Sequence, residues 1–369
     1  MKDKIRERCE LLVKNRKAIV KGFSFEKELM SITAAMMYTG IGREADVEKL
    51  KECQKILAKH TGLFSKFRKN VDLVLESRMA LSEDPEKYIG DLVDTCNKLR
   101  KSKMKENDFT IIAAMLICDL GKTDNTDEVM TRYTEIMKRM KKEHPFLTDE
   151  TDSSYVMLLA LSERDIDTIV SDMEECIGYF NSCKSEAGAD AIQGMGEVLA
   201  LAGGDIKAKC DRVDKIFALF KEKKAGFSGG REFVSLGALA DIDADAETLV
   251  DQIMEAADIL KEDNAFGSSS ADKGRRLMYA TTLVANCYRD ASAADDNTFI
   301  SSVLGILKDQ VTAAVISAMI QMLPSVLGAV VNSGDGSESA SASAGSDDGA
   351  VSTTVSSNSA GTMMENQNL

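Results

Sequence analysis

The strongest metal signal in the sequence is the alternating acidic run Asp241-Ile-Asp243-Ala-Asp245. Oxygens in this spacing begin a calcium loop, which then requires glycine at its sixth position and a bidentate glutamate at its twelfth. Those positions hold Ala246 and Gln252, so the loop is incomplete. The run also precedes an expected helix, where an aspartate can cap free backbone N–H groups. We favour capping and keep the three aspartates as a weak metal candidate.

The two histidines, His60 and His144, lack the surroundings of a catalytic base. Zinc and haem spacings are absent from the sequence. The sequence contains two glycine pairs, Gly203-Gly204 and Gly229-Gly230. Neither lies in G-x-x-x-x-G-K-[ST] or G-x-G-x-x-G, the two glycine motifs that bind phosphate groups. We therefore expect both histidines to have a structural or surface role. We also expect no bound cofactor and no catalytic residue, which favours a protein that is not an enzyme.

Cysteine usage and charge limit the compartment and the partners. The cysteines include no C-x-x-C pair, which indicates buried thiols in a reducing compartment. The segment Met1–Arg8 has no apolar secretion signal, so we expect a cytoplasmic protein. A net charge of −14 argues against nucleic acid as the partner, because phosphate binding depends on clustered Lys and Arg. The eight cysteines are Cys9, Cys53, Cys96, Cys118, Cys176, Cys183, Cys210 and Cys287.

The elements that hold these residues are expected to be helices. The chain has three prolines in 369 residues, and helix interiors exclude proline because it lacks an N–H and clashes with the preceding turn. There is no tryptophan, but there are 19 methionines, which fill irregular gaps between helices. Composition therefore predicts an all-α fold.

Two sequence phrases recur about every 40 residues. A small apolar run followed by an acidic turn occurs at 79–84, 159–165 and 199–205. A phenylalanine follows each charged helix and marks the other end of the unit. The marker phenylalanines are Phe23, Phe64, Phe146, Phe227 and Phe266. A fixed period of this length is typical of stacked helical hairpins.

Each unit is expected to contain a buried apolar helix, such as 109–118, and an amphipathic helix. The aspartates Asp84, Asp165 and Asp205 lie where they would cap the amphipathic helices, and Pro85 suits a first helical position. Residues 1–298 are thus predicted to form an α-solenoid-like array. Its basic N-terminal stretch is expected to be a capping helix.

The carboxyl end divides into two parts. Residues 299–332 are apolar, and 310–331 carry no charge over a length that could span a bilayer. Because Thr312, Ser317 and Pro324 interrupt this run, we favour a closing helix or a self-association surface over a membrane span. Residues 333–369 are rich in Ser, Gly and Ala and contain acids but no Lys or Arg, which predicts a disordered tail.

Three phrases point to a family. They are His144-Pro-Phe-Leu-Thr148, Ser154-Tyr-Val-Met-Leu-Leu-Ala-Leu161 and Gly194-Met-Gly-Glu-Val-Leu-Ala-Leu201. The chain resembles, over about residues 5–330, a bacterial family catalogued as domain of unknown function four thousand and three. The resemblance implies a bacterial cytoplasmic protein and carries over no activity or catalytic residue.

Two classes of function follow from these observations. The first is a non-enzymatic helical-repeat protein that binds a protein or peptide partner along a concave face. The alternative is an all-α enzyme, or a small-molecule or metal binder, with carboxylates in the groove around Asp241, Asp243 and Asp245. We favour the first, because the candidate acids fall at capping positions.

Overall fold

Every element that the structure describes is helical. The computed structural model describes residues 1–292, apart from gaps at 24–27, 62–70, 105–107, 150–151, 163, 228, 264–265 and 267–272. No strand occurs in these stretches, which confirms the predicted all-α fold. They all lie in the first of the chain's two units, Met1–Pro324. The second unit, Ser325–Leu369, lies outside the described residues, as do the expected apolar segment 299–332 and tail 333–369.

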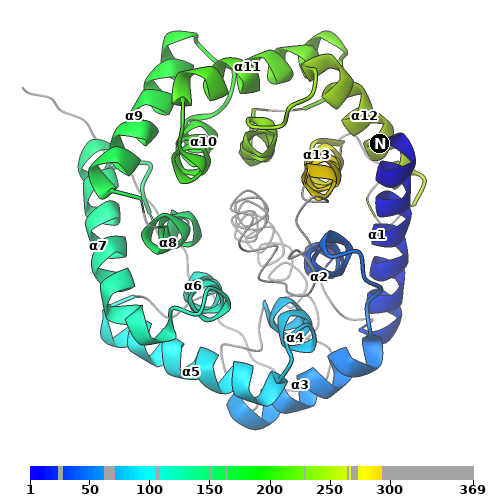
Figure 1. Cartoon of the computed structure of the whole chain (residues 1–369), viewed down its shortest axis with the longest axis vertical. Helices are drawn as coiled ribbons and strands as arrows, with labels where there is room; N and C mark the ends of the chain where they lie inside the picture. The colour runs from blue at the N-terminus through cyan, green and yellow to red at the C-terminus, as the bar shows by residue number, and fades with distance from the viewer. Residues whose placement is uncertain are drawn as a thin grey trace, which may run out of the picture. The chain divides into compact units, whose positions relative to one another are not determined.

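Within the first unit, helices alternate between the perimeter of a ring and its inner side (Figure 1). The perimeter helices are α1 (Lys2–Gly22), α3 (Val47–Thr61), α5 (Pro85–Lys101), α7 (Thr126–Glu143), α9 (Ile166–Ser182), α11 (Ile206–Glu222) and α12 (Ala246–Lys261). The inner elements are α2 (Glu28–Gly40), α4 (Asp72–Ala80), α6 (Asp108–Asp119), α8 (Ser153–Leu161), α10 (Ala189–Ala202), the 3-10 helix η4 (Arg231–Leu239) and α13 (Lys273–Ser292). A short 3-10 turn, η2 (Thr123–Asn125), precedes α7. Perimeter helices begin about 40 residues apart.

The two kinds of helix differ in how their apolar residues are distributed. In α5, the residues Tyr88, Ile89, Leu92 and Leu99 are buried while the opposite side is charged. That spacing places one apolar stripe against the inner layer. In α8, all nine residues are buried. The sequence therefore assigns the amphipathic segments to the perimeter and the uniformly apolar ones to the inner layer.

Aspartates cap five perimeter helices, four of them at positions for which the sequence favoured this role. Each side chain accepts a hydrogen bond from the backbone N–H three residues later, which satisfies an otherwise free donor. The pairs are Asp46 with Lys49, Asp84 with Lys87, Asp165 with Thr168, Asp205 with Ala208 and Asp245 with Thr248. Pro85 is the first residue of α5, as expected. These caps fix where the perimeter helices begin.

Two of these caps should make stability depend on pH in acid. Hydrogen bonds from the Thr168 and Thr248 amides hold the pKa values of Asp165 and Asp245 below their usual range. A lowered folded-state pKa adds stability above the unfolded-state pKa of about 4, and that stability is lost as the pH falls through the folded-state value. The double variant Asp165→Ala/Asp245→Ala should therefore have a lower thermal midpoint at pH 7. The difference from the parent should shrink toward pH 2.

Thermal unfolding followed by circular dichroism at several pH values between 2 and 7 checks this prediction. Asp243→Ala is the control, because Asp243 is exposed and is not the cap residue of α12. A difference that stays constant across the pH range would contradict the proposed role of the two carboxylates.

A repeated arginine contact fastens perimeter helices to the ends of inner ones. Arg132, the seventh residue of α7, donates hydrogen bonds to the carbonyls of Ala160, Ser162 and Arg164 at the end of α8. The last carbonyls of a helix have no partner within the helix, so the contact with the Ala160 carbonyl satisfies such an acceptor. Arg8, the seventh residue of α1, contacts the Thr39 and Gly40 carbonyls at the end of α2 in the same way.

Arg212, the seventh residue of α11, makes a contact of this kind with three carbonyls, as Arg132 does. It donates to the carbonyls of Leu239 (3.0 Å), Ile242 (2.6 Å) and Ala244 (2.6 Å). Arg212→Ala should lower the free energy of unfolding by about 2–3 kcal/mol, because three hydrogen bonds from a charged group are lost. Arg212→Lys keeps the charge without the planar fork and should recover only part of the loss. Urea denaturation measures both, and two equal losses would contradict the role of the fork.

The array closes on itself, which the sequence did not predict. Helix α1 packs against α12 and α13 as well as against α2 and α3 (Figure 1). The Lys4 ammonium donates to the Cys287 carbonyl at 3.3 Å, and Lys2 and Arg6 form ion pairs with Glu255. The expected capping helix therefore does not cover an open end. Instead it joins the first hairpin to the last.

Candidate functional site

In the structure, the three aspartates of the candidate metal run have different surroundings. Asp241 forms an ion pair with the ammonium of Lys209, whose side chain is only 9 % exposed. Asp245 caps α12, and Asp243 is exposed to solvent. Among the residues that the structure describes, no three His, Cys, Asp or Glu side chains are grouped so that they could hold a metal ion. Two of the three aspartates thus have local partners that account for them.

The two histidines connect neighbouring perimeter helices. His60, near the end of α3, contacts Glu86 in the first turn of α5. His144, which follows α7, contacts Glu174 of α9 with 2.8 Å between Nε2 and Oε1. The pKa of Glu86 is lowered, first by its hydrogen bond with His60 and then by that with Lys59. Both contacts hold adjacent hairpins together, which agrees with the expected structural role.

Three of the cysteines are unsuited to nucleophilic chemistry. All eight are free, and five of them are fully buried. Burial raises the pKa of Cys53 to about 11 and the pKa values of Cys9 and Cys118 to about 12. Because the thiolate is the reactive form, these three side chains are inert near neutral pH.

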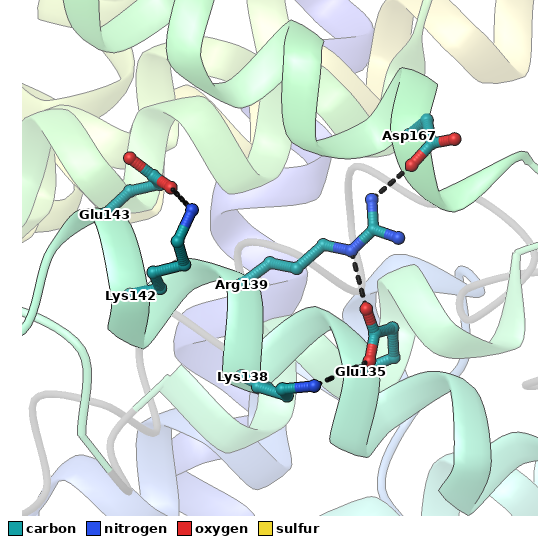
Figure 2. A network of polar contacts seen from close by, with 6 residues as sticks. All are labelled: Glu135, Lys138, Arg139, Lys142, Glu143 and Asp167. Carbon is teal, nitrogen blue, oxygen red and sulfur yellow. Dashed lines mark hydrogen bonds and ion pairs between the residues drawn. The ribbon is translucent and has the colours of Figure 1, made fainter.

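The perimeter carries networks of exposed ion pairs. Figure 2 shows one of them on α7 and α9, where Arg139 bridges Glu135 of its own helix and Asp167 of the next. Lys138 also pairs with Glu135, and Lys142 pairs with its neighbour Glu143. Exposed pairs of this kind contribute little to stability, because water and salt screen them. They make the outside of α7 a dense, mixed-charge surface.

A buried ion pair interrupts the apolar inner layer. The guanidinium of Arg78, on α4, lies 2.6 Å from a carboxylate oxygen of Asp119, on α6. Their side chains are 7 % and 0 % exposed. The guanidinium also lies over the ring of Tyr88, 4.8 Å from its centroid. Burial raises the pKa of Asp119, although the positive charge of Arg78 opposes that rise. The pKa of Tyr88 is also raised, first by burial and then by the Asp119 charge.

Arg78 and Asp119 occupy a position that is leucine in the later hairpins. Each lies six residues before the N-cap of the next perimeter helix, Asp84 and Asn125 respectively. The residues in this position in the following hairpins are Leu159, Leu199 and Leu239, all 0 % exposed. Sequence reasoning missed the pair, although aligning the hairpins on their caps would have revealed two charges among leucines. Both side chains are closed to solvent, so the pair is out of a ligand's reach.

Phe146 is the most exposed large apolar side chain of the described residues. It is 98 % exposed, and Met1, at 43 %, is the other exposed one. It lies in the loop between α7 and α8, which the Thr148 amide closes by donating to the His144 carbonyl at 3.0 Å. The other marker phenylalanines that the structure describes, Phe23, Phe227 and Phe266, are buried. Phe146 therefore departs from the packing role of its equivalents.

The fold is that of an all-α protein built of paired helices. Most of its candidate reactive side chains have hydrogen-bond or ion-pair partners on nearby elements. The chain belongs to the family described as protein of unknown function (DUF4003), which matches residues 15–323. This is the family that the packing phrases indicated. No curated protein and no solved structure matches the chain. Among the described residues, no helix is both long and apolar enough to cross a membrane.

Proposed function

We propose that this protein is a non-enzymatic binding protein of the bacterial cytoplasm, and that it recognises a protein or peptide partner through the loop around Phe146. The observation that carries the proposal is the complete exposure of this aromatic ring. Aromatic residues, Phe included, are enriched at the buried centre of protein interfaces, and exposing such a ring to water without a partner is unfavourable.

The surroundings of Phe146 support an interface of this kind. Lys138, Lys142 and Glu143 lie on the last turns of α7, directly before the loop, and their side chains are 47–80 % exposed. Protein interfaces commonly place an apolar centre inside a polar rim that stays partly hydrated. The partner is therefore expected to offer an apolar pocket for the ring and charged groups around it.

Site-specific photo-crosslinking in the native bacterium tests the proposal. A photoreactive side chain replaces Phe146 in one strain and Asn181 in another, because Asn181 is exposed at the end of the next perimeter helix, α9. We expect one discrete crosslinked protein from position 146 and none from position 181. The purified partner should then bind the Phe146→Ala variant at least about tenfold more weakly than the parent, the loss expected of an interface anchor.

Equal backgrounds from the two positions would overturn the proposal. A thermal shift of the purified protein with Ca²⁺, abolished in Asp243→Ala, would instead support the alternative of a metal binder with carboxylates at this turn.

A further inference from the structure

Charges of opposite sign occupy neighbouring helices beside the Phe146 loop. Residues 138–143, at the end of α7, include four cations and one acid. Helix α9 contains four acids and no Lys or Arg. The two helices pack against each other, and an ion pair between Arg139 and Asp167 joins them (Figure 2). A positive and a negative surface therefore lie side by side on the perimeter.

The positive surface is formed by three lysines of α7. Lys141 and Lys142 follow Lys138 by three and four residues, which places all three on one side of the helix. All three are exposed to solvent. Lys138 and Lys142 each pair with an acid of their own helix, and exposed pairs of this kind are weak. They can therefore exchange these partners for acids of another molecule.

The negative surface is formed by Asp167, Glu174 and Glu175 of α9. Asp167 and Glu175 are exposed, and the side chain of Glu174 is 40 % exposed. Within the described part of the chain, neither Lys141 nor Glu175 forms an ion pair. One exposed cation and one exposed anion are thus available for an ion pair with another molecule.

The Phe146 loop lies at the boundary between these two surfaces. It follows directly after the basic end of α7, and His144 at its start contacts Glu174 of α9 at 2.8 Å. The amides of Leu147 and Thr148 both donate to the His144 carbonyl, which holds the turn together. The exposed ring therefore stands next to cations on one side and acids on the other.

A surface with this arrangement is complementary to itself. A two-fold rotation places the positive surface of one copy against the negative surface of a second copy, and the reverse contact forms at the same time. The boundary between the surfaces lies near the axis, so the two Phe146 rings meet there and shield each other from water. A partner of uniform charge would instead be repelled by one of the two surfaces.

We propose that the partner at the Phe146 loop is a second copy of this chain, bound by two-fold symmetry. The inference rests on the proposed function, because it takes the same loop as the partner site and names the partner. The contact is formed by the α7–α9 patch, which consists of Lys138, Lys141, Lys142, Phe146, Asp167, Glu174 and Glu175. Because most of this patch is exposed charge, which salt screens, the dimer is weak and depends on ionic strength.

Sedimentation velocity of the full-length protein over a range of concentrations tests the inference. At an ionic strength of about 0.05 M we expect a monomer–dimer equilibrium, and at about 1 M, where the Debye length is only about 3 Å, association at least about tenfold weaker. A parent protein that stays monomeric at low salt and at the highest concentration would overturn the inference. If position 146 then crosslinks a different protein in the cell, the proposed partner site stands and the second copy is excluded.

Charge reversal tests the orientation of the two copies. Lys141→Glu and Glu175→Lys should each weaken dimerisation at least about tenfold, because each change brings like charges together twice in a two-fold dimer. An equimolar mixture of the two variants should dimerise about as strongly as the parent, since the reversed charges then face each other. Lys55→Glu, on the exposed side of α3, is the matched control and should change nothing. Parent-like dimerisation of both reversal variants, or a mixture that associates no better than either variant alone, would contradict the proposed dimer.

Discussion

The variant Arg78→Leu should lower the free energy of unfolding by about 3–5 kcal/mol, because it leaves the buried carboxylate of Asp119 without its cation. Asp119 is 0 % exposed, so water cannot replace the guanidinium. Urea denaturation at pH 7, followed by circular dichroism, measures the loss. The variant also removes the stacking of the guanidinium over Tyr88, which adds to the effect.

Replacing both charges should reverse most of this loss. The double variant Arg78→Leu/Asp119→Leu gives α4 and α6 the residue that the later hairpins have at Leu159, Leu199 and Leu239. Apolar replacements of buried ion pairs are commonly neutral or stabilising. If the double variant is as unstable as Arg78→Leu, the pair does more than fill a leucine position. This comparison separates the cost of an unpaired charge from the cost of lost volume.

The sign of the pH dependence provides a further check on Arg78→Leu. Burial already raises the pKa of Asp119, and removal of Arg78 removes the charge that opposes this rise. A raised folded-state pKa means that the folded protein binds the proton more tightly than the unfolded chain does, so stability falls as pH rises through that range. The deficit of Arg78→Leu should therefore become smaller when the pH is lowered from 7 toward 5. A deficit that is independent of pH would mean that Asp119 does not remain buried in the variant.

The variant Phe233→Ala should lower the free energy of unfolding by about 3–5 kcal/mol, because it creates a cavity between two perimeter helices. Phe233 is 0 % exposed and packs edge-to-face against Phe180 of α9, 5.4 Å between ring centroids, and against Phe217 of α11, 4.9 Å away. The chain offers a matched control with the same chemical change. Phe146→Ala removes an equal ring that is 98 % exposed and should change stability by less than about 0.5 kcal/mol.

Chemical denaturation of both phenylalanine variants under identical conditions gives this comparison directly. Similar losses in the two variants would mean that Phe146 is buried in solution, which would also remove the observation behind the proposed partner site. A small loss in Phe233→Ala would indicate that the inner layer relaxes to fill the cavity.

Much of the helical layout could be predicted from the sequence, because the signals for it are local. A helix cap involves residues three apart, as in Asp165 and Thr168, and an apolar stripe extends over four or five turns. The capping role of Asp245 could also be predicted on local grounds, since this residue directly precedes α12. For the same reason the family could be recognised from short packing phrases, which extend no further than one helix.

The closure of the ring, the buried pair and the exposure of Phe146 were decided only by the tertiary structure. Lys4 and Cys287 meet although they lie 283 positions apart in the sequence, and their contact depends on the accumulated angles between all of the hairpins. No local sequence pattern contains information about the sum of these angles. Likewise, the sequence alone would allow Arg78 and Asp119 to lie on a solvated surface. Only the packing of α4 against its neighbours buries them. The sequence determined which segments are helices, and the long-range packing decided which of their side chains meet.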